Sequence, residues 1–139
     1  MAYLYIETYR EGDGKERPLA HGLLSGRMTA ETTFASDDWR SKSDLFVGEA
    51  FRRNLAVVRE LGAFAAARNA TVAQLAIAWA LANPAVDVAI VGARSPEQIR
   101  QTAPSADLRL WLDDIHQIDS ILRADVAVGG PAPEAMPRS

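Results

Sequence analysis

The stretch VDVAIVGARSPEQIRQ, at residues 86–101, limits the possible folds of this chain more than any other segment. Residues 86–91 are apolar except for Asp87 and have the length of a strand, which predicts a parallel strand that is buried on both faces. A Gly-Ala-Arg turn follows, and Ser95 and Pro96 then supply the N-cap and the first position of a helix. The stretch therefore predicts a strand, a turn and a helix, which is the connection typical of α/β proteins.

The junction between this strand and this helix offers an anion-binding site. Free backbone N–H groups at the helix start, and the positive end of the helix dipole, would point out of the strand's carboxyl end. Gly92 allows a ligand to approach the backbone closely, and Arg94 offers a planar fork that suits a phosphate. The same residues would also form an ordinary strand-to-helix turn with a solvated arginine, so spacing alone leaves both interpretations open.

Helical periodicity predicts three further helices. Between Phe46 and Asn69, apolar residues fall on one face of the first helix. Thr71 and Gln74 form a capping-box signature that opens the second, VAQLAIAWALAN, which is apolar nearly all round and is therefore expected to be buried. Asn83 and the proline after it end this helix. The last helix places four aliphatic residues on one face: Ile115, Ile118, Ile121 and Leu122.

The remaining segments carry weaker signals. Residues 2–9 alternate loosely between apolar and polar positions, which is a weak strand signal. Residues 29–45 are polar and predict a long surface loop. The end of the chain is rich in proline and glycine, as expected for a flexible tail.

The composition excludes several classes of protein. A chain of 139 residues can form one domain with a core, and its net charge of −3 does not favour nucleic acid or an anionic membrane as a partner. Because there is no cysteine, disulfides, thiolate catalysis and cysteine-based zinc sites are excluded, and a reducing cytoplasm is the expected location. The N-terminus does not predict a signal peptide, and no apolar run approaches the ~20 residues of a membrane helix. His21 and His116 are the only histidines, and their spacing predicts no metal site.

Four motifs follow one another along the chain: PLAHGLLSGR at 18–27, DDWRS at 37–41, the helical stretch at 51–86, and VAIVGARSPEQIRQT at 88–102. In this order they resemble the C-terminal part of the aldo-keto reductases, from the loop after the seventh strand to the phosphate-binding turn after the last strand. The resemblance runs from about Pro18 to Leu122.

The fold of that family is a (β/α)8 TIM barrel, which usually needs ~250 residues. The resemblance therefore implies a helix-rich α/β fragment, the C-terminal part of an incomplete barrel with at most one or two strands. It divides the chain into a divergent N-terminal segment at 1–17, an aldo-keto reductase portion at 18–122 and a flexible tail at 123–139.

The resemblance also implies that NADPH binds in extended form across the C-terminal face of the barrel. Four residues would then line its pyrophosphate and nicotinamide side: Leu19, Ala20, His21 and Arg27. Arg40 would lie beside the adenosine phosphates. Five residues would hold the 2′-phosphate and the adenine: Gly92, Arg94, Gln98, Gln101 and Thr102.

Two positions depart from the family's pattern. Gln101 and Thr102 stand where the family usually has Glu-Asn, which weakens the expected contact with adenine. Trp111 stands where a serine usually caps the last helix, so that the helix start loses a side-chain acceptor worth about 1 kcal/mol.

The catalytic residues of the family have no counterpart in this sequence. The family uses an Asp-Tyr-Lys-His constellation from the first half of the barrel, in which tyrosine donates a proton while hydride arrives from NADPH. The chain's tyrosines and lysines all lie outside such a motif: Tyr3, Tyr5, Tyr9, Lys15 and Lys42. We therefore assign no catalytic residue.

The leading hypothesis is that the chain is the NADPH-binding part of an aldo-keto reductase, with NADPH and a small carbonyl substrate as partners, and that it is inactive as a reductase by itself. A second hypothesis is a truncated, non-catalytic protein that associates with itself, because an unpaired apolar strand invites pairing with another chain. A third is a small hydrolase that uses Ser25 with His21 or His116, although LLSGR lacks the pattern of a nucleophile elbow.

Overall fold

The computed structural model describes residues 19–43, 45–84 and 86–124, and in these residues the chain is helical and contains no strand. The described residues form four α-helices: α1 (Gly48–Ala66), α2 (Val72–Leu81), α3 (Pro96–Thr102) and α4 (Leu112–Ala124). Three short 3₁₀ helices complete this part of the chain: η1 (Ala20–Ser25), η2 (Trp39–Lys42) and η3 (Ala103–Asp107). A helix-rich fragment is thus confirmed. The predicted strand at residues 2–9 lies outside the described residues. Of the predicted tail at 123–139, residues 123 and 124 belong to α4 and the rest lies outside the described residues.

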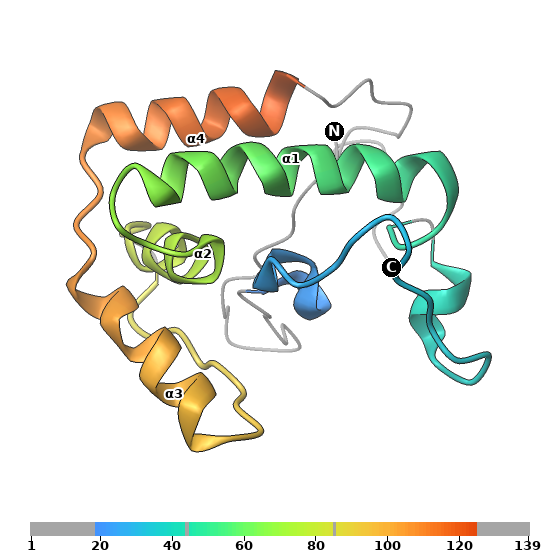
Figure 1. Cartoon of the computed structure of the whole chain (residues 1–139). Coiled ribbons are helices and arrows are strands. Elements are labelled where there is room, and N and C mark those ends of the chain that lie inside the picture. The colour runs from blue at the N-terminus through green and yellow to red at the C-terminus, as the bar shows by residue number, and fades with distance from the viewer. Residues whose placement is uncertain (1–18, 44, 85, 125–139) are drawn as a thin grey trace, which may run out of the picture.

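α1 is the longest of the described helices, and α2, α4 and η1 pack against it. α4 lies along one side of it, and α2 and η1 lie on the other side (Figure 1). These four elements share one core, in which Leu24 from η1, Leu61 from α1, Leu75 from α2 and Ile118 from α4 are all buried. The apolar faces predicted for the first and last helices therefore meet each other and α2.

The second predicted helix forms as expected. Thr71 Oγ1 accepts the backbone N–H of Gln74 at 3.2 Å, and Gln74 Oε1 accepts the backbone N–H of Thr71 at 2.9 Å, which confirms the capping box. Its apolar side chains are buried from Val72 to Ala80, except that Ala73, Gln74 and Trp79 are half-buried. α2 is therefore the most deeply buried of the described helices.

The predicted buried strand at residues 86–91 is wrong. This segment is not paired as a strand, and the side chains of Val88 and Ile90 are 69% and 81% exposed. An apolar run of this kind forms a buried strand only where neighbouring strands cover its edges and layers cover its faces. No strand lies beside it among the residues that the structure describes.

The start of α4 differs from expectation in its capping. Trp111 does not cap the first turn, and its indole is 75% exposed. The Asp114 carboxylate instead accepts the backbone N–H of Trp111 at 2.9 Å. Asp114, the third residue of α4, thus accepts a hydrogen bond from the residue that precedes the helix. This contact is one half of a capping box.

Candidate functional site

An open depression of about 1120 Å³ lies between three segments: η1 with its flanking residues, the residues around η2, and the loop that leads into α3. Seven of the ten residues predicted for the site line it: Leu19, His21, Arg27, Arg40, Gly92, Arg94 and Gln98. The three motifs that contribute them are far apart in the sequence, so the fold is what brings them together. Ala20, Gln101 and Thr102 do not line the depression.

One wall of the depression is a left-handed turn at the start of η1. Ala20, His21 and Gly22 have φ angles of 45°, 56° and 95°. Glycine adopts such angles readily, but alanine and histidine do so at an energetic cost. The turn carries one internal hydrogen bond, from the N–H of Gly22 to the carbonyl of Leu19 at 2.8 Å.

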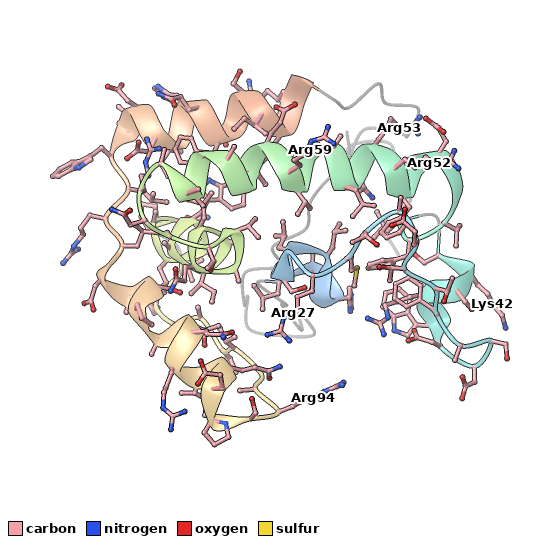
Figure 2. The ribbon with its side chains drawn as sticks, viewed as in Figure 1. Arg27, Lys42, Arg52, Arg53, Arg59 and Arg94 are labelled. Atoms are coloured by element: carbon pink, nitrogen blue, oxygen red, sulfur yellow. The ribbon has the colours of Figure 1, made fainter. Side chains whose placement is uncertain are left out.

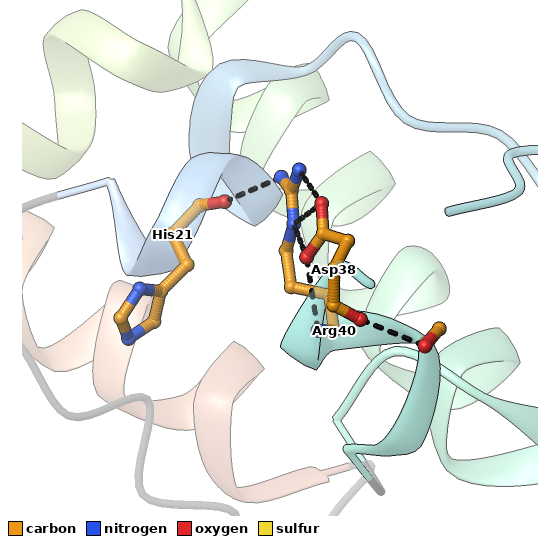
Figure 3. Close-up of polar contacts among 4 residues, drawn as sticks. His21, Asp38 and Arg40 are labelled. Atoms are coloured by element: carbon orange, nitrogen blue, oxygen red, sulfur yellow. Dashed lines mark hydrogen bonds and ion pairs between the residues drawn. The ribbon is translucent and has the colours of Figure 1, made fainter. Parts of the chain in front are cut away.

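Arg40 contacts this turn from η2 (Figure 3). Its guanidinium forms a two-bond ion pair with Asp38, with distances of 3.0 Å from Nε to Oδ1 and 2.6 Å from a terminal nitrogen to Oδ2. Its other terminal nitrogen donates to the His21 carbonyl at 3.3 Å. Its carbon lies 4.5 Å from the centre of the Phe34 ring. The charge of Arg40 is therefore already matched within the protein, and the Arg40 hydrogen bond lowers the pKa of Asp38.

Arg94 lies at the opposite rim and differs from Arg40 in its contacts. Its side chain is exposed and extends away from the loop before α3 (Figure 2). Among the described residues its guanidinium forms no ion pair. Beside it, a Cβ added at Gly92 would meet no atom within 4 Å, so open space lies next to the backbone. This rim can therefore admit an anion without displacing a protein group.

The backbone at the start of α3 is less available than the sequence suggested. The N–H of Gln98 donates to Ser95 Oγ at 3.3 Å, which confirms the predicted N-cap. The side chain of Gln98 turns back and accepts the N–H of Arg94 at 2.6 Å. Two of the N–H groups that could face a ligand are thus already bound, and the Arg94 side chain is the principal cationic group at this rim.

Arg27, which lines the depression, and Gln101, which does not, connect two of the segments around the site. Arg27 donates to Gln101 Oε1 at 3.5 Å, a long hydrogen bond between the loop after η1 and α3. Gln74 of α2 donates to the Gln101 carbonyl at 2.7 Å and anchors the same turn of α3. The hydroxyl of Thr102 donates to the Gln98 carbonyl at 2.9 Å, so it bonds along its own helix.

Charge on the lining is mixed, with a small positive excess. Three arginines (Arg27, Arg40 and Arg94) face two carboxylates, Asp37 and Asp38. Since Arg40 and Asp38 neutralise each other, Arg27 and Arg94 remain against Asp37. This charge balance favours an anionic ligand, and the electrostatic preference for it is modest because the excess is a single positive charge.

Sequence reasoning missed Asp38 as a member of the site. The signal was present in the Asp-Trp-Arg spacing of the second motif, because an aspartate at an N-cap two residues before an arginine can bind both the helix start and the guanidinium. Asp38 does so, accepting the N–H of Arg40 at 3.0 Å as well as its side chain. Sequence reasoning also missed Trp39. This residue is half exposed, and its ring contacts the His21 ring edge to face, with 4.6 Å between the ring centres.

The structure offers no support for a hydrolase that uses Ser25. The Ser25 hydroxyl donates to the Gly22 carbonyl at 2.6 Å, so its proton is directed to the turn and away from any base. Within the described residues, no group of three or more histidine, aspartate and glutamate side chains could hold a metal ion. The helices of this part of the chain are too short or too polar to cross a bilayer.

Comparison with known proteins agrees with the motifs. The sequence model described as "Aldo/keto reductase family" matches residues 16–123. An aldo-keto reductase of Bacillus subtilis, YhdN, is 34% identical over 110 residues, which are 78% of this chain and 33% of that protein. An uncharacterized oxidoreductase of Mycobacterium tuberculosis is 39% identical over 93 residues, 67% of this chain and 28% of that protein.

A solved structure shows the same arrangement of elements. The glycerol dehydrogenase of Gluconobacter oxydans superimposes with a TM-score of 0.77 at 32% identity, over 86% of this chain and 36% of that chain. The chain thus spans about a third of the length of the relatives that it matches. The match over most of its residues shows that this chain belongs to the aldo/keto reductase family.

Proposed function

We propose that the chain binds the 2′-phosphate end of NADPH in the depression between η1, η2 and the loop before α3. The observation that carries the proposal is the Arg94 guanidinium, which is exposed, forms no ion pair with a described residue and stands beside the open backbone at Gly92. A planar guanidinium binds a phosphate through two parallel hydrogen bonds, and only NADPH carries a phosphate at the ribose 2′ position.

The remaining lining residues suit an extended nucleotide. Arg27 supplies a second cation near the same rim, and Leu19 and Met28 supply apolar surface. NADPH would supply the hydride for carbonyl reduction when it is bound. The residues of this chain would hold and orient the nucleotide, and Arg40 would shape the site without binding a phosphate.

Titration of the purified chain with NADPH and with NADH tests this proposal. We expect NADPH to bind at least about tenfold more tightly, which corresponds to about 1.4 kcal/mol. Arg94→Ala should bring the two affinities together, and Gly92→Ala should weaken both without lowering the melting temperature. Arg109→Ala is the matched control, because Arg109 is exposed and lies outside the depression.

Two results would refute the assignment. One is equal affinity for the two nucleotides in the unmodified chain. The other is an Arg94→Ala variant that still prefers NADPH to the same degree as the Arg109→Ala control does.

We further propose that this chain alone does not reduce carbonyl compounds, because no tyrosine of the sequence stands in the family's proton-donor motif. NADPH oxidation in the presence of simple aldehydes should not exceed the buffer control. Turnover that Tyr3→Phe, Tyr5→Phe or Tyr9→Phe abolishes would contradict this proposal. Carbonyl reduction by an assembled barrel that includes this portion, and a cytoplasmic location, remain predictions.

A second candidate function is self-association. It is favoured by the exposed aliphatic side chains of Val88 and Ile90, in a segment that pairs as a strand with none of the described residues. An exposed apolar strand edge is a template for pairing with another chain. This candidate is compatible with cofactor binding, and its test is given in the Discussion.

A further inference from the structure

Arg40 is the most fully engaged side chain of the candidate site. It contacts the carboxylate of Asp38 and the carbonyl of His21 (Figure 3), and it also lies over the aromatic ring of Phe34. Its side chain is 29% exposed and that of Asp38 is 24% exposed, so both lie partly within the fold. A guanidinium with this many partners has few N–H groups left for a ligand.

The carbonyl that Arg40 binds belongs to the strained turn. His21 has a φ angle of 56° and Ala20 one of 45°, both in the left-handed region that non-glycine residues seldom adopt. Such angles persist only where surrounding contacts hold them. The His21 carbonyl is held by Arg40 at 3.3 Å, and the His21 ring lies against Trp39, the neighbour of Arg40.

We infer that Arg40 and Asp38 form a positioning pair that fixes the left-handed turn at residues 20–22 as one wall of the depression. Asp38 orients the guanidinium and caps η2, and the guanidinium holds the His21 carbonyl. This role differs from the one that the resemblance implied, in which Arg40 would lie beside the adenosine phosphates. The inference concerns the site of the proposed function and rests on that function where cofactor affinity is the measurement.

The two roles predict opposite effects for Asp38→Asn. If Arg40 binds a phosphate, removal of the neighbouring negative charge should leave NADPH binding unchanged or strengthen it. If the pair positions the turn, the same substitution should weaken NADPH and NADH together, by about tenfold each, because the ion pair and the acceptor at Oδ2 are lost. The side-chain amide oxygen of the asparagine in this variant can still accept the backbone N–H of Arg40, so η2 keeps its cap.

Arg40→Lys and a glycine rescue sharpen the test. Lysine keeps the charge but loses the planar fork, so we expect it to weaken both nucleotides about as much as Asp38→Asn does. Adding Ala20→Gly to Arg40→Lys should restore part of the affinity, because glycine adopts the left-handed angle without strain. Arg94→Ala should change only the ratio of the two affinities. This difference distinguishes a residue that contacts the 2′-phosphate from a residue that positions the turn.

A measurement without cofactor keeps the inference separate from the proposed function. Amide hydrogen exchange of residues 19–24 should become faster in Asp38→Asn and in Arg40→Lys, while exchange in the middle of α1 stays unchanged. Faster exchange together with no nucleotide binding by the unmodified chain would refute the proposed function and leave the positioning pair supported. Unchanged exchange, or tighter NADPH binding in Asp38→Asn, would overturn the positioning pair.

Discussion

Arg68 and Asp114, which are 46 positions apart in the sequence, form an ion pair that joins the turn after α1 to the first turn of α4. Asp114 is buried and also accepts the backbone N–H of Trp111. Arg68 donates to the Phe64 carbonyl at 3.2 Å, and its guanidinium lies 3.6 Å from the centre of the Phe64 ring. The pair thus fixes the register of the two helices that cover the core.

Asp114→Asn should therefore destabilise the chain. We expect the free energy of unfolding to fall by about 1–3 kcal/mol, because the variant loses the ion pair and leaves Arg68 only partly bonded. Chemical denaturation followed by circular dichroism measures this. Asp113→Asn is the matched control, since Asp113 is exposed on the same turn. Equal effects of the two substitutions would show that the pair contributes nothing specific.

The same pair makes stability depend on pH. The hydrogen bond from Trp111, and then that from Arg68, lower the pKa of Asp114 in the folded chain. An unfolded aspartate has a pKa of about 3.9, so the unfolded chain takes up its proton first as the pH falls. The contribution of Asp114 is complete above that value and is lost as the pH falls through its folded pKa.

We expect the free energy of unfolding to decline below about pH 4, and the decline to be shallower in Asp114→Asn. Denaturation series between about pH 2 and pH 7 would show this. Parallel curves for the unmodified chain and for Asp114→Asn would contradict the assignment of the pKa shift to this contact. Asp38, whose pKa is also lowered, should retain its share of the decline in both.

Gly26 and Gly62 should respond oppositely to alanine. Gly26 has a φ angle of +72°, and a Cβ there would lie 2.8 Å from Val72 Cγ1, so Gly26→Ala must move α2 or the loop after η1. We expect the free energy of unfolding to fall by about 1–3 kcal/mol in Gly26→Ala.

Gly62 lies within α1, and a Cβ added there would meet no atom of a neighbouring segment within 4 Å. Gly62→Ala should raise the free energy of unfolding by about 0.5–1 kcal/mol. Thermal unfolding compares them directly, and a destabilising Gly62→Ala would count against the α1 geometry.

Local sequence signals predicted the helices well. The capping box at Thr71 and Gln74, the Ser95 cap and the apolar stripe of α1 depend on residues within one or two turns, and such interactions form wherever the chain is helical. α1 begins at Gly48, two residues after the predicted start at Phe46, because Val47 remains extended. Boundaries of this kind depend on tertiary contacts and are the least predictable feature of a helix.

The burial of residues 86–91 could not be predicted in the same way. An apolar run reports that a segment suits a buried strand, but burial depends on neighbours that the run itself does not encode. The site shows the same limit. The motifs named seven residues that line one depression, but only the structure shows that Arg40 is paired with Asp38 while Arg94 stands free of ion pairs among the described residues. Whether an arginine can bind a ligand depends on which carboxylates the fold places beside it.

Val88 and Ile90 should mediate pairing between two copies of the chain. Suppose that two copies of this segment pair in antiparallel fashion about a two-fold axis perpendicular to the sheet. Two residues that face each other are then both even-numbered or both odd-numbered, and their side chains lie on the same face. A register centred on Ala89 therefore places Val88 of each copy against Ile90 of the other and gathers four exposed side chains on one face. Pairing would remove their apolar surface from water and would satisfy backbone groups of residues 86–91.

Light scattering across a dilution series should show a mass that rises from monomer to dimer with concentration. Replacing Val88 and Ile90 together by threonine keeps the β propensity but adds a hydroxyl to each exposed position, and should weaken association at least about tenfold. Leu112→Thr is the control, because Leu112 is equally exposed but lies on α4. A chain that stays monomeric at high micromolar concentration, while melting cooperatively, would show that residues 86–91 tolerate exposure alone. Equal weakening by the control would assign the association to α4 and leave the strand edge without a partner.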